Sequence, residues 1–302
     1  MDKMKISVIG AGKVGTVLGC LISRSGFSFC GLYSKNKNSS EKAIKYIGKG
    51  KVFSSIADLV RKSGVIVIAV DDSEVKNVAG EIVEESRLRK IKLVGKVCVH
   101  TSGALSSSIL LPLSKAGCSV ASLHPLQAIA SVDSGIALIK DSYFCIEGER
   151  NAVAIAQRIV KKIGGTSFQI EPAHKHAYHL AACFLSNYIV SLSDMIIEKL
   201  LPPTRSKNEW LKIFAPLIRG TAENLKAKGI PDALTGPISR GDSQTIQRHF
   251  EALKDLDPDL RKLHRILAQR AVEIAIRQGH LSKEKKNMLI RLFRMKKNVE
   301  RK

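Results

Sequence analysis

The sequence predicts a doubly wound α/β domain followed by an all-helical domain. Two observations lead to this fold class. From residue 1 to about residue 170, short apolar runs alternate with helical patterns, which is typical of βαβ units around a parallel sheet. After Glu171 and Pro172 the chain shows helical patterns and no convincing strand. The length of 302 residues suits two ordinary domains, which we place at residues 1–171 and 172–302.

The short apolar runs of the first part are the candidate strands. They cover residues 6–9, 28–33, 52–53, 65–70, 97–100, 119–123, 143–146 and 166–170. Between the first two runs, apolar residues recur at helical spacing and stop at Gly26, which suits the left-handed end of a helix. For the next helix, Asn38 and Glu41 stand at the spacing of a capping box, and Gly48 marks its end.

The second part of the chain predicts a long helix and several shorter ones. Residues 173–201 are almost entirely apolar on their inner faces, so we expect a central buried helix that ends at Pro202 and Pro203. Further helices are expected at about residues 208–228, 243–254, 258–278 and 282–297.

Composition limits the class of partner. Apolar residues make up 44% and charged residues 25% of the chain, as in globular proteins with a full core. The net charge of +22 raises the question of nucleic acid. Aromatic residues are only 5%, however, and they do not alternate with basic ones in a way that offers stacking platforms. We therefore do not expect nucleic acid as the main partner. Surplus surface lysine, or attraction of an anionic cofactor and substrate, explains the charge equally well.

The chain is expected to be cytoplasmic. The first strand-like run starts almost at the initiator Met, which leaves no room for a signal peptide. No later segment reads as long and apolar enough to span a bilayer, so no membrane partner is expected. The six cysteines form no CxxC pair, and we interpret them as reduced core thiols. A thiol nucleophile stays possible, although no His-rich context surrounds any of them.

A GxGxxG motif follows the first strand and opens the first helix. Gly10 allows a tight turn, Gly12 lets backbone N–H groups approach a pyrophosphate, and Gly15 allows close packing of helix on strand. Lys13 adds a cation at the helix N-terminus, which itself favours phosphate. This context predicts a Rossmann dinucleotide site. The alternative is a glycine turn without a ligand.

The end of the second strand indicates which dinucleotide binds. An NAD site would place a carboxylate there for the ribose hydroxyls. This chain has Tyr33, Ser34, Lys35, Asn36 and Lys37 instead. The hydroxyl of Ser34 and the ammonium of Lys35 suit a 2′-phosphate, so we predict NADP(H). Alternatively, Lys35 and Lys37 are ordinary loop lysines.

Polar residues also follow later strands, where ligands of parallel sheets bind. Asp72 follows the fourth strand, Ser102 and Gly103 follow the fifth, and His124 follows the sixth. Asp72 is best explained as a helix cap. Because two consecutive strand ends carry Ser102 and His124, we predict that both orient substrate, with capping or packing as the alternative.

These features together resemble the 6-phosphogluconate dehydrogenase-like superfamily, which includes ketopantoate reductase, pyrroline-5-carboxylate reductase and deazaflavin-dependent NADP oxidoreductases. More closely, the chain resembles Rossmann-like proteins with a C-terminal domain of unknown function 2520, a branch without an assigned substrate. The matching segments are residues 100–104, 123–127, 178–182, 186–188, 236–237 and 240–242.

The resemblance implies candidate catalytic residues. In better-known relatives a Lys and an Asn four residues apart begin the long helix of the second domain, and the Lys moves a proton at the reacting oxygen. Here Lys175 and His179 hold that spacing, and either is a candidate acid or base. His179 in place of Asn departs from the pattern. A solvated Lys175 and a core His179 are the alternatives. The relatives also imply a homodimer.

Two more residues are predicted to orient substrate. Asn187 lies two turns beyond His179. Arg240 precedes Asp242, which we expect to cap the following helix. Arg240 can bind a carboxylate or phosphate in fork geometry, or simply lie exposed in a turn. His174, His176 and His179 do not match a zinc spacing, so we expect no metal.

The sequence therefore predicts an NADP(H)-dependent oxidoreductase for a small, anionic carbonyl or imine substrate. The competing prediction is a protein that senses NADP(H) redox state without catalysis, because a Rossmann fold alone does not imply an enzyme.

Overall fold

The structure is a computed structural model that describes residues 4–254 and 256–299, without the side chains of residues 294–299. The chain forms two compact units that divide after Tyr188. The first unit thus includes residues 172–188, which lie beyond the domain boundary we placed near residue 171. That boundary stays a prediction.

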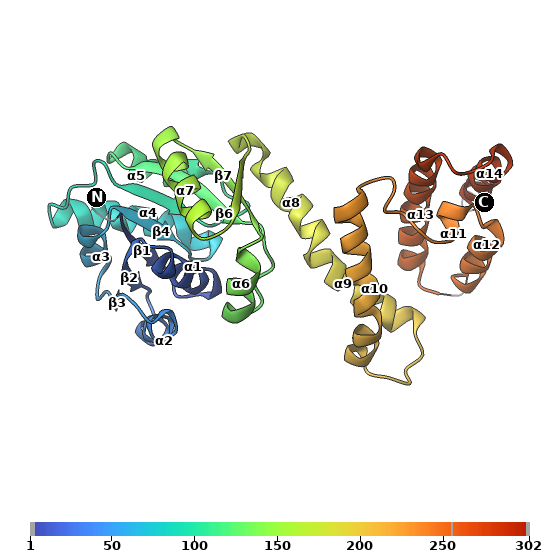
Figure 1. Ribbon diagram of the computed structural model, residues 1–302, viewed down its shortest axis with the longest axis horizontal. Coiled ribbons are helices and arrows are strands. Elements are labelled where there is room, and N and C mark those ends of the chain that lie inside the picture. Colours follow the sequence, from blue (N-terminus) through green and yellow to red (C-terminus); the bar gives the residue numbers. More distant parts are fainter. Residues whose placement is uncertain (1–3, 255, 300–302) are drawn as a thin grey trace. The chain divides into compact units, whose positions relative to one another are not determined.

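The first unit contains one sheet of eight strands in the order β3-β2-β1-β4-β5-β6-β7-β8 (Figure 1). The strands are β1 Lys5–Ile9, β2 Ser28–Tyr33, β3 Lys51–Val52, β4 Val65–Ile68, β5 Val97–His100, β6 Ser119–Pro125, β7 Tyr143–Gly148 and β8 Thr166–Gln169. Each predicted run is therefore a strand, and the doubly wound α/β class is confirmed. Strands β6 and β7 pair antiparallel, however, whereas we expected a parallel sheet.

Helices cover both faces of this sheet. They are α1 Lys13–Arg24, α2 Lys37–Ile47, α3 Ile56–Lys62, α4 Asp72–Leu88, α5 Leu111–Lys115, α6 Val132–Ile139, α7 Arg150–Lys162 and α8 Lys175–Leu185, with 3₁₀ turns at Ser107–Leu110 and Pro172–His174. One buried cluster joins α1 and α7 to the sheet, and a second joins α3 and α4 to its other face. Strands buried on both faces explain why the runs read as continuously apolar.

The start of α2 differs from the expectation. Its cap is Asn36, whose side chain accepts a hydrogen bond from the backbone N–H of Ser39 at 3.1 Å. Asn38 and Glu41 both lie inside the helix, so the predicted capping box is wrong. The same side-chain chemistry applies two residues earlier, and Gly48 ends the helix in the left-handed conformation as expected.

The second unit is helical throughout its described residues. Its helices are α9 Asn187–Leu200, which begins in the first unit, α10 Lys207–Lys228, α11 Pro237–Arg240, α12 Ser243–Ala252, α13 Pro258–Gln278 and α14 Lys283–Val299. Apolar side chains of α12, α13 and α14 form a small core, which includes Phe250, Val272, Leu289 and Phe293. The basic C-terminal helix is thus anchored on its own unit.

The predicted central buried helix is wrong in two respects. The backbone breaks at Ser186, which separates α8 from α9, and Lys175 and Ile197 are the only buried residues that the two helices show. By length and composition Pro172–Leu200 could cross a membrane, with 6% of an apolar 18-residue stretch within it buried. The expectation that no such segment exists is therefore wrong on that measure. Most of its side chains are exposed or half-buried among the described residues.

Candidate active site

The glycine loop between β1 and α1 is shaped by close backbone contacts. Gly10 has φ +113°, and a Cβ there would lie 2.1 Å from the carbonyl oxygen of Ala69. A Cβ on Gly15 would lie 2.1 Å from the carbonyl oxygen of Gly10. At Gly12 a Cβ would meet nothing within 4 Å, so this residue faces open space. Gly10 and Gly15 are therefore required by packing, whereas Gly12 leaves room for a ligand.

The N-terminus of α1 beside this loop is free of competing groups. Gly12 is the N-cap residue and supplies no side-chain cap, and no acidic residue occupies the first turn. Lys13 is the first residue of the helix and is exposed. Uncapped N–H groups and a positive helix end form a standard anion site. These residues fit a dinucleotide diphosphate.

A cavity of about 340 Å³ continues from the loop to the end of β2. It is lined by residues that include Gly10, Gly12, Ser34, Lys35 and Glu74. The Ser34 hydroxyl donates to the carbonyl oxygen of Asn36 at 2.8 Å and lies 2.8 Å from Oγ of Ser40. The Lys35 ammonium pairs with Glu74 at 2.5 Å. Both predicted phosphate donors lie at the cavity, and both already have protein partners.

The first turn of α8 brings Lys175 under the ends of β5 and β6. Its side chain is fully buried, and Nζ donates to the carbonyl oxygen of Ser102 at 3.1 Å and to Oγ of Ser122 at 2.8 Å. The ammonium also lies 5.9 Å from the centre of the Tyr178 ring. Burial lowers the pKa of Lys175. Lys175 is thus neither solvated nor a lining residue of the neighbouring cavity.

Next to Lys175, two imidazoles from different elements approach each other. The rings of His124 on β6 and His179 on α8 lie 6.0 Å apart, edge to face. A Cβ on Gly103 would lie 2.5 Å from Cδ2 of His179 and 2.7 Å from Nε2 of His124. Glycine at this strand end therefore lets both imidazoles pack against the backbone.

His124 also contacts Tyr178, a residue that we did not predict as functional. Its Nδ1 lies 2.9 Å from the Tyr178 hydroxyl. Burial, helped by the charge of Lys175, lowers the pKa of His124 to about 3. Burial likewise lowers the pKa of His100 to about 4. Both rings are therefore neutral at pH 7.

A cavity of about 640 Å³ opens beside these rings, within the size range of small-molecule sites. His124, Tyr178, His179, Cys183 and Asn187 all line it. The structure therefore gathers three predicted residues, His124, His179 and Asn187, around one cavity of the first unit. Sequence reasoning missed Tyr178 and Cys183. Sγ of Cys183 lies 3.9 Å from Nδ1 of His179, and their spacing of one helical turn was a signal for this contact.

Other predicted residues lie elsewhere. Ser102 is buried, and its Oγ accepts hydrogen bonds from the backbone N–H groups of Ala104 and Leu105, as a turn-capping hydroxyl does. Asp72 begins α4 after the cap residue Asp71 and makes no cap hydrogen bond itself. Arg240 is exposed in the second unit, and Asp242 caps α12 as expected.

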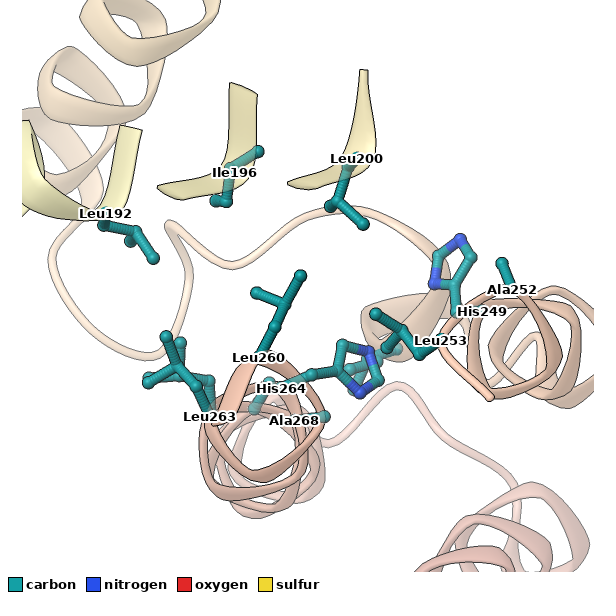
Figure 2. A pocket seen from close by; sticks show the side chains of 13 residues that line it. Leu192, Ile196, Leu200, His249, Ala252, Leu253, Leu260, Leu263, His264 and Ala268 are labelled. Atoms are coloured by element: carbon teal, nitrogen blue, oxygen red, sulfur yellow. The ribbon is translucent and has the colours of Figure 1, made fainter. Parts of the chain in front are cut away.

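The second unit has a cavity of its own, of about 490 Å³, between α9, α12 and α13 (Figure 2). Aliphatic side chains such as Leu192, Ile196 and Leu263 dominate its walls, and His249 and His264 are its only polar lining residues. Their rings lie 6.4 Å apart. Within the described residues no group of His, Cys, Asp or Glu side chains could hold a metal ion.

Comparison with known families divides the chain into two matches. Residues 1–125 match the model of a Rossmann-like domain, and residues 142–271 match the domain of unknown function DUF2520. The chain belongs to the Rossmann-like proteins that carry a DUF2520 domain. The DUF2520 match begins before β7, so this domain includes the last two strands of the sheet as well as α8 and its histidine.

Solved structures share this fold along nearly their full length. A protein from Thermotoga maritima is 25% identical with a TM-score of 0.68, covering 91% of this chain and all of the other. A Bacteroides fragilis protein described as a candidate NADP oxidoreductase is 22% identical with a TM-score of 0.67, covering 90% and 99%. Plasmodium falciparum pyrroline carboxylate reductase, solved with NADP bound, is 16% identical with a TM-score of 0.56, covering 95% and 99%. Comparison with curated protein sequences gives no match.

Proposed function

We propose that this protein is an NADP(H)-dependent oxidoreductase that acts on a small, anionic carbonyl or imine substrate. The observation that carries the proposal is the pairing, within one unit, of an open glycine loop at a helix N-terminus with a cavity lined by His124, His179 and Asn187. The NADP named for two structural neighbours supports the choice of cofactor.

The cofactor contacts follow from the loop geometry. Gly10, Gly12 and Gly15 would shape the loop so that free backbone N–H groups at the start of α1 reach the diphosphate, and Lys13 would add a positive charge. Ser34 and Lys35 would bind the 2′-phosphate after exchanging their present partners Ser40 and Glu74. When bound, NADPH supplies a hydride.

The proposed acid–base residues have different surroundings. His179 lines the cavity, so its imidazole can exchange a proton with a substrate. Lys175 lies beneath, where its ammonium holds Ser102 and Ser122 and places positive charge near a developing oxyanion. Ser102 would orient substrate indirectly, by holding the backbone of Ala104 and Leu105, whose N–H groups bond its hydroxyl. Asn187 would bind the substrate directly, because it lines the same cavity.

Calorimetry and turnover test this proposal. NADPH should bind the purified full chain, and Gly12→Glu should abolish binding because a carboxylate would occupy the space for the diphosphate. NADPH oxidation across a panel of 2-keto acids, aldehydes and cyclic imines should reveal a substrate, and His179→Ala should lower kcat about 10²- to 10⁴-fold. His176→Ala, an exposed change in the same helix, is the control. Binding of neither NADPH nor NADH to folded protein rejects the proposal.

A second candidate function is a redox sensor without turnover. The observation in its favour concerns Lys175, which the resemblance implies as the catalytic Lys. Its side chain is fully buried and does not line the cavity. NADPH binding with no turnover across the whole panel would select this function.

We further propose a cytoplasmic homodimer, with neither membrane nor nucleic acid as partner. Exposed apolar side chains support the dimer: α10 spans 22 residues and buries none of them. Lys207, at the start of α10, forms ion pairs with Asp194 and Glu198 of α9, as expected of a surface in water.

A further inference from the structure

The two ring nitrogens of His124 have different surroundings. Nδ1 lies 2.9 Å from the hydroxyl of Tyr178, which comes from α8. Nε2 has no hydrogen-bond partner among the described residues, and the ring lines the 640 Å³ cavity. Gly103 lies beside Nε2 and carries no side chain that would collide with it, since a Cβ there would lie 2.7 Å from Nε2. One nitrogen is therefore held by the protein, and the other is available to a ligand.

The direction of the Tyr178 hydrogen bond decides which nitrogen carries the proton. Burial raises the pKa of the Tyr178 phenol well above its usual value, so the hydroxyl keeps its proton and can donate it. The phenol proton is then free for Nδ1, whose lone pair is a stronger acceptor than a phenol oxygen. The proton of the neutral ring consequently lies on Nε2.

The charges around His124 keep this ring neutral. Lys175 lies beneath it, and His100 and His179 are the other basic side chains that act on it. Tyr178, which contacts Nδ1, and the neighbouring thiol of Cys145 both have raised pKa values because they are buried. Among the described residues that line the cavity there is no carboxylate. The site therefore presents a neutral N–H donor above a buried ammonium.

We propose that Tyr178 is a positioning residue that fixes His124 as an Nε2–H donor, and that this donor recognises the oxygen of a carbonyl substrate rather than a protonated imine. The second half rests on the proposed function. A carbonyl oxygen has lone pairs that accept the Nε2–H bond. A protonated imine has none on its nitrogen, carries a positive charge that Lys175 repels, and finds no carboxylate in the cavity.

In this reduction NADPH is the reductant and supplies the hydride, and a residue assigned here supplies the proton. The carbonyl carbon gains the hydride, and the π electron pair moves to the oxygen. His124 donates its Nε2–H hydrogen bond to that oxygen throughout, and His179 delivers the proton that completes the alcohol. His124 thus resembles a neutral electrophilic histidine, which stabilises an oxyanion without giving up its own proton.

The tautomer can be measured without knowing the substrate. Protein labelled with ¹⁵N-histidine should show His124 protonated at Nε2, with no titration between pH 8 and pH 5, and the signals are assigned by their loss in His124→Asn. Tyr178→Phe keeps the ring contacts and removes the hydroxyl, so His124 should shift to a mixture of both tautomers. Tyr143→Phe, an exposed hydroxyl, is the matched control and should change nothing. A proton on Nδ1, or a tautomer unchanged in Tyr178→Phe, overturns the positioning role.

The substrate half is tested with NADPH and the full-length protein. Across matched pairs of carbonyl and cyclic imine substrates, turnover should be confined to carbonyls, and Tyr178→Phe should lower kcat about tenfold, the worth of one hydrogen bond. Turnover of imines alone overturns the carbonyl assignment. If calorimetry finds no NADPH binding, the proposed function fails, whereas the His124 spectrum still decides the role of Tyr178.

Discussion

Gly103 is the residue on which the arrangement of the two imidazoles depends. A Cβ there would lie 2.5 Å from His179 and 2.7 Å from His124, closer than real Cβ atoms approach other atoms. We predict that Gly103→Ala displaces both rings and lowers kcat at least 100-fold, by analogy with the loss of one positioned donor. NADPH affinity should stay within about twofold by calorimetry, since Gly103 does not line the cavity at the glycine loop. Full activity in Gly103→Ala would contradict the assigned geometry.

The buried histidines also predict how stability depends on pH. His100 and His124 have folded-state pKa values of about 4 and about 3, below the value of about 6.5 in an unfolded chain. Above pH 6.5 both states are neutral at these sites. As the pH falls towards 4, the two histidines bind protons in the unfolded state but stay neutral in the folded state. The free energy of unfolding therefore falls, by up to about 2.7 kcal/mol per pH unit for the pair.

Urea denaturation between pH 7.5 and 4.5 measures this loss. Carboxylates contribute to acid sensitivity as well, so the comparison is with His124→Gln, which should show a shallower decline. Equal slopes for the two proteins would show that His124 is not held neutral.

Some site residues were predictable because they directly follow a recognisable strand or stand at the spacing of a known family. His124 follows β6 directly, and His179 stands at family spacing in α8, so both were found. Tyr178 and Cys183 were missed because their roles depend on contacts: Tyr178 reaches His124 from another element, and Cys183 meets His179 only once the helix is formed. Lys175 was found by spacing, but its burial depends on Ser102 and Ser122, which come from β-strand ends far away in sequence.

At the scale of elements, the strands were predictable because they are buried on both faces and so are apolar without interruption. The antiparallel pairing of β6 and β7 was not, because strand direction depends on the path of the connection rather than on the apolar run. The break between α8 and α9 was also missed. The residue at the break, Ser186, is neither proline nor glycine, and the apolar pattern continues on both sides of it.

The pairing of the β2 loop with α4 leads to a prediction about cofactor choice. Lys35 is paired with Glu74, from the first turn of α4, at 2.5 Å. The Glu74 carboxylate competes with a 2′-phosphate for this ammonium. Glu74→Gln should therefore bind NADPH more tightly, by up to about fivefold, while its affinity for NADH changes little. Lys35→Ala should weaken NADPH binding and leave NADH binding unaffected.

Titration calorimetry with both dinucleotides checks this prediction, with Lys37→Ala as the control, since Lys37 begins α2 and does not line the cavity. Equal losses of affinity for NADPH and NADH in Lys35→Ala would show that Lys35 does not bind the 2′-phosphate.

At the scale of the whole molecule, the surface that needs explanation is apolar rather than charged. On α10, Ile213, Leu217, Ile218 and Leu225 are each more than 40% exposed. Their spacing puts them along one side of a helix about 33 Å long. Such a stripe is unfavourable in water and is typical of an interface between subunits. A membrane span in Pro172–Leu200 is the competing explanation for the exposed apolar residues of the chain, but it does not account for α10.

We therefore predict that the protein sediments as a homodimer in buffer without detergent. Leu217→Glu places a charge in the apolar stripe and should yield monomers at micromolar concentration, with a lower Tm because the stripe is then left in water. Lys212→Glu puts the same carboxylate on the opposite side of α10, where charged residues recur, and should leave the dimer intact. Sedimentation velocity over a hundredfold concentration range separates the two results. If the unmodified protein sediments as a monomer, the predicted dimer is rejected. If it stays in solution only with added detergent, or co-sediments with vesicles, a membrane span is favoured instead.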